Sequence, residues 1–176
     1  AAQSGLQTIT WANNETFWRH TLEVNARSFL AHNNLGAVYM LSGKLAQAAV
    51  ELEAAVALQP DDPDALVNLG MVLVRAGLQE KARGFLERGL RARPEDPKAH
   101  LMLGMIAVDT GDYGTALAHL QPLAAADPAD PVTHTALARA LAGLGRTAEA
   151  RAVLQEVLRH TPGYRPAVEA LSALPH

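Results

Sequence analysis

A period of 34 residues runs through most of the chain and restricts its fold more than any other feature of the sequence. Four residue types keep this spacing over four copies. A fixed period of this length indicates a stack of small helical or strand-containing units, none of which can bury its apolar face alone. The repeated residues are the prolines Pro60, Pro94, Pro128 and Pro162, the glycines Gly43, Gly77, Gly111 and Gly145, the alanines Ala48, Ala82, Ala116 and Ala150, and the leucines Leu35, Leu69, Leu103 and Leu137.

Each copy has the pattern of two helices joined by a tight turn. In the stretch "AHNNLGAVYMLSGKLAQAAVELEAAVALQP", apolar residues recur at helical spacing on both sides of Gly43. Gly43 supplies a left-handed turn, and the small Ala48 lets the two helices approach closely. Pro60 ends the second helix, and the strings "PDDPDA", "PEDPKA" and "PADPVT" each place an Asp before a Pro at the start of the next one. The sequence therefore predicts helix–turn–helix units.

This pattern resembles the tetratricopeptide repeat (TPR). In the first copy the signature is matched by Leu35, Gly36, Tyr39, Gly43, Ala48, Leu52, Ala55 and Pro60, and in the last copy Ala138 replaces the glycine. The resemblance implies an all-α fold, a right-handed TPR superhelix (α-solenoid) of four full repeats. We expect repeats at 29–62, 63–96, 97–130 and 131–164, after an N-terminal segment 1–28 with a half-repeat capping helix and before a solvating cap helix in 165–176.

Pro122 is an irregularity inside the second helix of the third copy. It removes a hydrogen bond to Ala118 and is expected to kink the helix. Either the curvature of the stack changes there or the proline is tolerated, and we favour tolerance.

The segment "WANNETFWRHT", residues 11–21, holds both tryptophans. Residues 10–26 are in register with the second helix of a repeat whose first helix is missing, and Trp18 aligns with Leu52 of the next copy. Because a terminal repeat lacks one neighbour, we expect Trp18 in the core and Phe17 and Trp11 over the open end.

The longer string "TWANNETFWRHTLEVNARSFLAHNNLG" resembles the juncture before the C-terminal TPR array of multi-spanning membrane glycosyltransferases (O-mannosyltransferase-like proteins). Ala26 departs from that pattern, which prefers proline. The resemblance implies that residue 1 lies just outside a membrane of a bacterial cell, that the array is extracytoplasmic, and that sugar transfer belongs to a membrane half outside this chain. The matching residues are Trp11, Asn13, Phe17, Trp18, Thr21, Leu22, Asn25, Ala31, His32, Asn34, Leu35 and Gly36.

The composition argues against several function classes. A formal net charge of −3 gives no general attraction to nucleic acid. Cysteine is absent, and no apolar run approaches the 18 residues of a membrane span. No nucleotide-binding or catalytic motif occurs, so we expect no enzyme and no cofactor. His32, His100 and His134 share one repeat position, but that position packs inside its own repeat, so we expect no metal site.

The remaining candidate is a surface. In the TPR family, repeat positions 2, 5, 6, 9, 12 and 13 line a concave groove, and here the middle of that groove is rich in methionine, which adapts to varied partners. Asn34 and Asn68 share a position from which an amide could bind a peptide backbone. The methionines could instead seal repeat against repeat, or be buried in a homo-oligomer. The predicted groove residues are Asn33, Asn34, Ala37, Val67, Asn68, Met71, Val74, Arg75, Leu101, Met102, Met105, Val108, Asp109 and Arg139.

These observations predict a non-catalytic protein–protein interaction domain that binds a polypeptide segment in its groove. The groove does not resemble the clamp type that grips chaperone tails, because Ala37 and Met102 stand where that type needs polar or basic residues. We expect the chain to be the extracytoplasmic tail of a membrane glycosyltransferase-like protein. The alternative is a free-standing periplasmic or cytoplasmic TPR scaffold in a multiprotein assembly.

Overall fold

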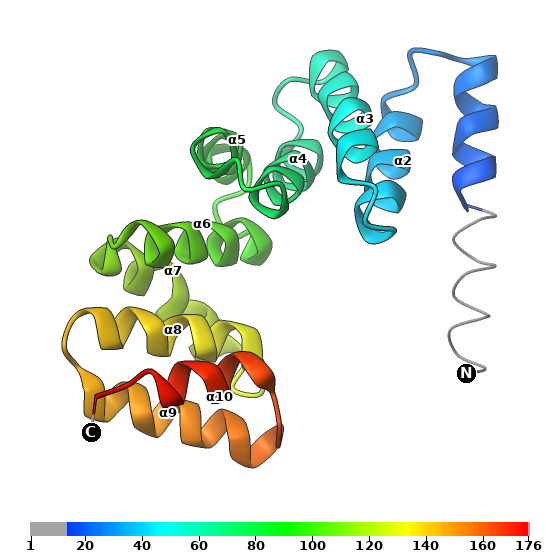
Figure 1. The fold of residues 1–176 in the computed structure, drawn as a ribbon. Coiled ribbons are helices and arrows are strands. Elements are labelled where there is room, and N and C mark those ends of the chain that lie inside the picture. The colour runs from blue at the N-terminus through cyan, green and yellow to red at the C-terminus, as the bar shows by residue number, and fades with distance from the viewer. Residues whose placement is uncertain (1–13, 176) are drawn as a thin grey trace. The chain divides into compact units, whose positions relative to one another are not determined.

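A computed structural model describes residues 14–175 of the chain, and within that range the regular structure is entirely α-helical (Figure 1). The prediction of an all-α fold is therefore confirmed. Residues 14–24 form the described part of a first helix. The helices that follow are α2 (Phe29–Leu41), α3 (Leu45–Leu58), α4 (Pro63–Arg75), α5 (Gln79–Ala92), α6 (Pro97–Thr110), α7 (Tyr113–Ala126), α8 (Pro131–Gly143), α9 (Thr147–His160) and α10 (Arg165–Ser172).

The helices form two compact units, which we call unit 1, up to Asp96, and unit 2, from Pro97 onward. In unit 1, α2 packs on α3, α4 packs on α5, and both α2 and α3 contact α4. In unit 2, α6 packs on α7 and α8 on α9, while α8 also contacts α6 and α7. The short α10 lies against α8 and α9. Each of the four predicted repeat ranges thus holds one helix pair.

The helix ends follow from the capping residues seen in the sequence. Asp62 accepts a hydrogen bond from the N–H of Ala65 at the start of α4, with Pro63 at the first helical position. At the turn between α2 and α3, Gly43 has φ of 76°, a left-handed conformation that glycine adopts without strain. The N–H of Lys44 then reaches back to the carbonyl of Tyr39 at 2.9 Å, which closes the end of α2.

In the first three repeats, a leucine of the second helix packs on a glycine of the first. A Cβ atom on Gly36 would lie 2.5 Å from Cγ of Leu52, and one on Gly104 would lie 2.6 Å from Cγ of Leu120. Both leucines are fully buried. Only a residue without a side chain allows this approach, so the repeated glycine sets the distance between the paired helices. In the fourth repeat Ala138 takes that place and is itself fully buried.

Pro122 lies within α7, which runs as one helix from Tyr113 to Ala126. The structure agrees with the expectation that this proline is tolerated. Its side chain is exposed. The ring therefore does not disturb the buried face that carries Leu120 and Ala124.

The N-terminal half-repeat differs from the expected core arrangement. Trp18 is half-buried, whereas the aligned Leu52 is 0% exposed. Phe17 is 60% exposed, and its ring meets the Trp18 ring edge-on at a centroid distance of 4.7 Å. Leu52 is covered by the first helix of its own repeat, and residues 14–24 have no such helix before them among the described residues. Trp11 lies outside the described residues.

No helix in residues 14–175 is both long and apolar enough to cross a membrane.

Candidate functional site

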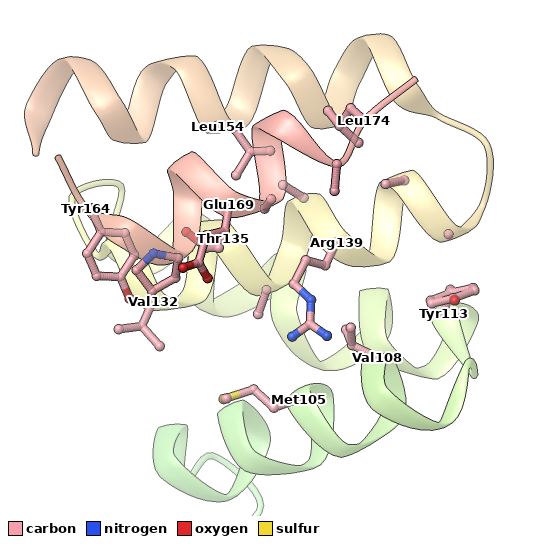
Figure 2. Close-up of a pocket in the computed structure, with 17 residues that line it drawn as sticks. Met105, Val108, Tyr113, Val132, Thr135, Arg139, Leu154, Tyr164, Glu169 and Leu174 are labelled. Atoms are coloured by element: carbon pink, nitrogen blue, oxygen red, sulfur yellow. The ribbon is translucent and has the colours of Figure 1, made fainter. Parts of the chain in front are cut away.

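A pocket of about 520 Å³ opens in unit 2, on the side formed by α6, α8 and α10. Figure 2 shows side chains from all three helices turned toward the same space. We call this cavity the unit 2 pocket. It is lined by Met105, Val108, Tyr113, Val132, Thr135, Ala136, Ala138, Arg139, Ala142, Gly143, Leu154, Tyr164, Pro166, Glu169, Ala170, Ala173 and Leu174.

The pocket is wide because α8 and α10 present mainly small side chains to it. Four alanines line it: Ala136, Ala142, Ala170 and Ala173. Between Val132 and Arg139 on α8, no lining side chain is larger than that of Thr135. The hydroxyl of Thr135 donates to the carbonyl of Pro131 at 2.7 Å, so this polar group is satisfied inside its own helix. The interior of the pocket is therefore largely apolar.

Charged groups lie at the open side of the pocket. Figure 2 shows Arg139 on α8. Its Nη2 lies 2.9 Å from Oδ1 of Asp109 on α6. Both side chains are close to half exposed. On α10, Oε1 of Glu169 accepts a hydrogen bond from Nε of Arg165 at 2.6 Å. Because each charge has a partner nearby, the rim is polar without a strong net charge.

Two tyrosines stand at opposite ends of the pocket in Figure 2. Tyr164 directly precedes α10, and Tyr113 begins α7. A Cβ atom on Gly143 would lie 2.3 Å from Cζ of Tyr113, so the tyrosine ring rests directly on the backbone at Gly143. A side chain at that position would displace the ring.

Sequence reasoning missed the contribution of the C-terminal helix. We expected a solvating cap helix in 165–176; α10 packs on α8 and α9 and buries Ala167, and it also lines the pocket with Glu169 and Ala170, which that expectation did not include. The 34-residue period of the sequence already pointed to this helix. Continuing the 34-residue period into a fifth copy that starts at residue 165 places groove positions 2, 5, 6 and 9 at Pro166, Glu169, Ala170 and Ala173, all of which line the pocket.

In unit 1 the predicted groove residues bond to one another and to the backbone. Nδ2 of Asn68 donates to Oδ1 of Asn33 at 3.1 Å, and Nδ2 of Asn34 donates to the carbonyl of Leu30 at 2.7 Å. Arg75 donates to the carbonyl of Met40 at 2.8 Å. The side-chain amides of Asn34 and Asn68, which we expected to bind a peptide backbone, therefore each donate a hydrogen bond inside unit 1. Peptide binding by these residues stays a prediction.

The other predicted groove residues differ in accessibility. Val67 is 2% exposed, because its Cγ2 packs against Gly89 of α5, and Val108 is 6% exposed. Ala37, Met71, Val74, Leu101, Met102 and Met105 are half-buried. Of the fourteen predicted residues, Met105, Val108 and Arg139 line the unit 2 pocket, and Asp109 joins them through its ion pair with Arg139.

The three histidines at one repeat position do not converge. Nδ1 of His32 lies 2.7 Å from Glu51, and Nδ1 of His134 faces the carbonyl of Asp130 at 2.9 Å. His100 contacts the ring of His119. Across residues 14–175, no three acidic or imidazole side chains come together as a metal site would require.

Asp130 fixes the start of α8 and hence the position of the pocket residues that follow. Burial raises the pKa of the Asp130 carboxyl, but the hydrogen bonds donated by the hydroxyl and N–H of Thr133 and by the N–H of Val132 lower the pKa by more than burial raises it. The net result is a pKa below the ordinary value. The carboxylate is therefore held in its charged form as a helix cap.

The family model described as "Tetratricopeptide repeat" matches residues 39–106 and 107–174. No curated protein gives a significant match. Among solved structures, YrrB, described as "a TPR protein with an unusual peptide-binding site", is 20% identical, with a TM-score of 0.76 over 97% of this chain and 88% of its own. MamA AMB-1 is 26% identical, with a TM-score of 0.73 over 84% of this chain and 86% of its own.

The Cut9–Hcn1 tetramer of the APC/C also matches, at 21% identity and a TM-score of 0.78, over 89% of this chain and 31% of that one. The matched family model covers well over half of the 176 residues. The chain belongs to the tetratricopeptide repeat family and is a non-catalytic protein-interaction domain.

Proposed function

We propose that the unit 2 pocket binds a polypeptide partner by taking up an apolar side chain of an extended or helical segment. The observation that carries the proposal is the pocket itself, an opening of about 520 Å³ bordered by alanines and Met105. A buried aromatic or aliphatic anchor supplies most of the affinity in such recognition, while polar groups at the rim set orientation. Arg139 and Glu169 are suitably placed for that second role.

The family and the fold support this reading. YrrB, which shares the fold, is described as having a peptide-binding site. Met105 adds a flexible, polarisable wall that can adapt to different side chains. The bound segment would therefore be recognised by one apolar anchor and by hydrogen bonds to the side chains at the rim.

A displayed library of random peptides tests the proposal. Peptides enriched on the wild-type domain should lose at least tenfold in affinity with Met105→Glu, because the substitution places a charge in the pocket. Val168→Glu is the matched control, since Val168 is on α10, 45% exposed and outside the pocket lining. Equal loss with both variants, or none with Met105→Glu, would contradict the proposal.

We also propose that the chain is the extracytoplasmic tail of a membrane glycosyltransferase-like protein and recruits a polypeptide there. The support is the juncture motif, whose matching residues all lie in the described range except Trp11 and Asn13. Sequencing the source gene upstream of Ala1 tests this. Several apolar runs of about 20 residues would agree. A lone signal peptide or a start codon would instead indicate the free-standing scaffold.

A further inference from the structure

The two end helices of the described range are opposite halves of a repeat. Residues 14–24 are in register with the second helices, because Trp18 lies 34 residues before Leu52. The short α10 is in register with the first helices, because Leu171 lies 34 residues after Leu137. Within residues 14–175, the helices from α2 to α9 form complete pairs, and the two end helices are left without a partner from their own repeat.

A helix pair is held together at a few repeat positions, counted from the first residue of each repeat. Position 8 of the first helix lies under position 24 of the second, and a Cβ atom on Gly36 would be 2.5 Å from Cγ of Leu52. Position 4 lies beside position 23, and Nδ1 of His32 is 2.7 Å from Oε2 of Glu51. We call these four the pairing positions. At the two end helices they show what a partner helix would meet.

At both ends an apolar side chain at a pairing position is exposed. Val168, at position 4 of α10, is 45% exposed, and Phe17, at position 23 of the first helix, is 60% exposed. In the second repeat the same two positions hold Leu66, which is 0% exposed, and Phe85, which is half-buried. Val168 and Phe17 are thus the same kind of aliphatic–aromatic pair, divided between the two ends of the chain.

The other two pairing positions match in size. Ser172, at position 8 of α10, is a small residue where the complete repeats have glycine or Ala138. Its hydroxyl donates to the carbonyl of Glu169 at 2.8 Å, so this polar group is already satisfied within α10. Position 24 of the first helix holds Trp18, which is only half-buried. The exposed Ser172 therefore leaves room for a large ring to pack on it.

The charges at the two ends do not oppose such a contact. On α10, Nε of Arg165 lies 2.6 Å from Oε1 of Glu169. At the other end, Nζ of Lys44 lies 2.8 Å from Oε2 of Glu15. The other acidic and basic side chains of residues 14–24, histidine apart, are one arginine and one glutamate. Neither surface therefore carries an excess of one charge that would repel the other.

We propose that copies of this chain associate end to end, with residues 14–24 of one copy packed on α10 of the next as the second helix of a composite repeat. The contact continues the helix pairing that the chain already forms within each complete repeat. It is heterologous, because the two surfaces differ, so an open dimer keeps one free surface of each kind and can add further copies. The occupant of the exposed face of α10 is thus a second copy of the chain.

The composite repeat is independent of the unit 2 pocket. Glu169, Ala170 and Ala173 of α10 line the pocket, whereas Val168 and Ser172 do not. Peptide binding and end-to-end association therefore use different sides of one short helix. A failure of the proposed function would leave this proposal intact.

Sedimentation velocity of the full chain over a range of concentrations tests the proposal. The contact joins one helix of each copy, so the interface is small, and we expect a dissociation constant between about 10 µM and 1 mM. The average mass of the wild type should rise with concentration through this range. Phe17→Glu and Val168→Glu should each weaken association about tenfold or more, because each places a charge in an apolar contact.

A mixture of these two variants separates end-to-end association from other modes. Phe17→Glu keeps an intact α10, and Val168→Glu keeps an intact first helix, so the mixture restores one surface of each kind. At a concentration where the wild type associates, each variant alone should be monomeric. The equimolar mixture should form a one-to-one dimer that grows no further. A contact between two like ends would instead leave one of the variants associating by itself.

Val50→Glu is the matched control, because Val50 is 64% exposed on α3 and lies outside the pairing positions. It should leave association unchanged. A wild type that stays monomeric up to about 1 mM would overturn the proposal. So would association of wild-type strength in either variant alone, or a mixture of the two variants that forms no dimer.

Discussion

Unit 1 and unit 2 use the same 34-residue lattice but place different side chains on the face formed by their first helices. At repeat position 6, unit 1 has Asn34 and Asn68, whose amides donate hydrogen bonds inside the unit. In unit 2, the fourth repeat and α10 have Ala136 and Ala170 there, and both line an open pocket. The comparison shows that the candidate pocket lies where small residues replace polar ones at this repeat position.

The two units have equivalent cores, and substitutions in these cores should have the largest effect on stability. Leu52→Ala in unit 1 and Leu120→Ala in unit 2 should each cost about 2–5 kcal/mol, because each leucine is fully buried on a glycine. Chemical denaturation of both variants gives the free energies of unfolding. A loss in one variant that is several-fold the loss in the other would show that the two cores are packed differently.

Pro122 distinguishes the third repeat from the others, which have Ala54, Arg88 and Glu156 at this position. Pro122→Ala should stabilise unit 2 by about 1–3 kcal/mol, because it restores a helical N–H donor and removes a ring from the helix interior. Thermal unfolding monitored by circular dichroism measures the change. An unchanged or lower melting temperature would mean that the ring makes stabilising contacts of its own.

The half-repeat differs from the complete repeats in the burial of Trp18, which aligns with Leu52 of the next repeat. Since the ring is only half-buried, Trp18→Ala should cost about 1–2 kcal/mol, below the roughly 3–5 kcal/mol of a fully buried tryptophan. Phe17→Ala, at a side chain that is 60% exposed, is the control and should change stability little. A loss at Trp18 as large as that of Leu52→Ala would place this ring in the core after all.

The substitution Asp130→Ala should have the smallest of these effects on stability, and the size of the effect should depend on pH. Asp130→Ala should destabilise unit 2 by about 1 kcal/mol at neutral pH through loss of the helix cap. The pKa of this carboxyl is lowered in the folded state, so its contribution is present above the unfolded value near 3.8 and is lost as the pH falls through the folded value. The stabilities of variant and wild type, measured from pH 6 down to pH 2, should therefore converge.

The fold was predictable because the residues that define it are local and periodic. Gly43 and its counterparts, the Asp-Pro pairs and the glycine that meets Leu52 all act within one repeat. The candidate site was predictable only in part. Met105 and Arg139 were found from repeat positions, whereas Glu169 and Ala170 were missed because the last helix was interpreted as a cap.

The remaining features depend on which partner each side chain chooses. Asn68 turns to Asn33 rather than outward, and Tyr113, on a second helix, covers Gly143 from outside the expected groove positions. The contact of His100 with His119 joins two positions 19 residues apart, and only His100 belongs to the histidines that share a repeat position in the sequence. A pattern of repeat positions does not contain these pairwise choices.

The most direct test of the pocket is a nuclear magnetic resonance titration of the labelled domain with a peptide selected from the library. The wild type should show shift changes concentrated at Met105, Thr135, Arg139, Ala142 and Ala173. Ala142→Met, which installs the residue of the first repeat at position 12, should fill the pocket and weaken binding at least tenfold while the fold persists. Shift changes confined to unit 1, with binding unaffected by Ala142→Met, would contradict the assignment of the unit 2 pocket as the binding site.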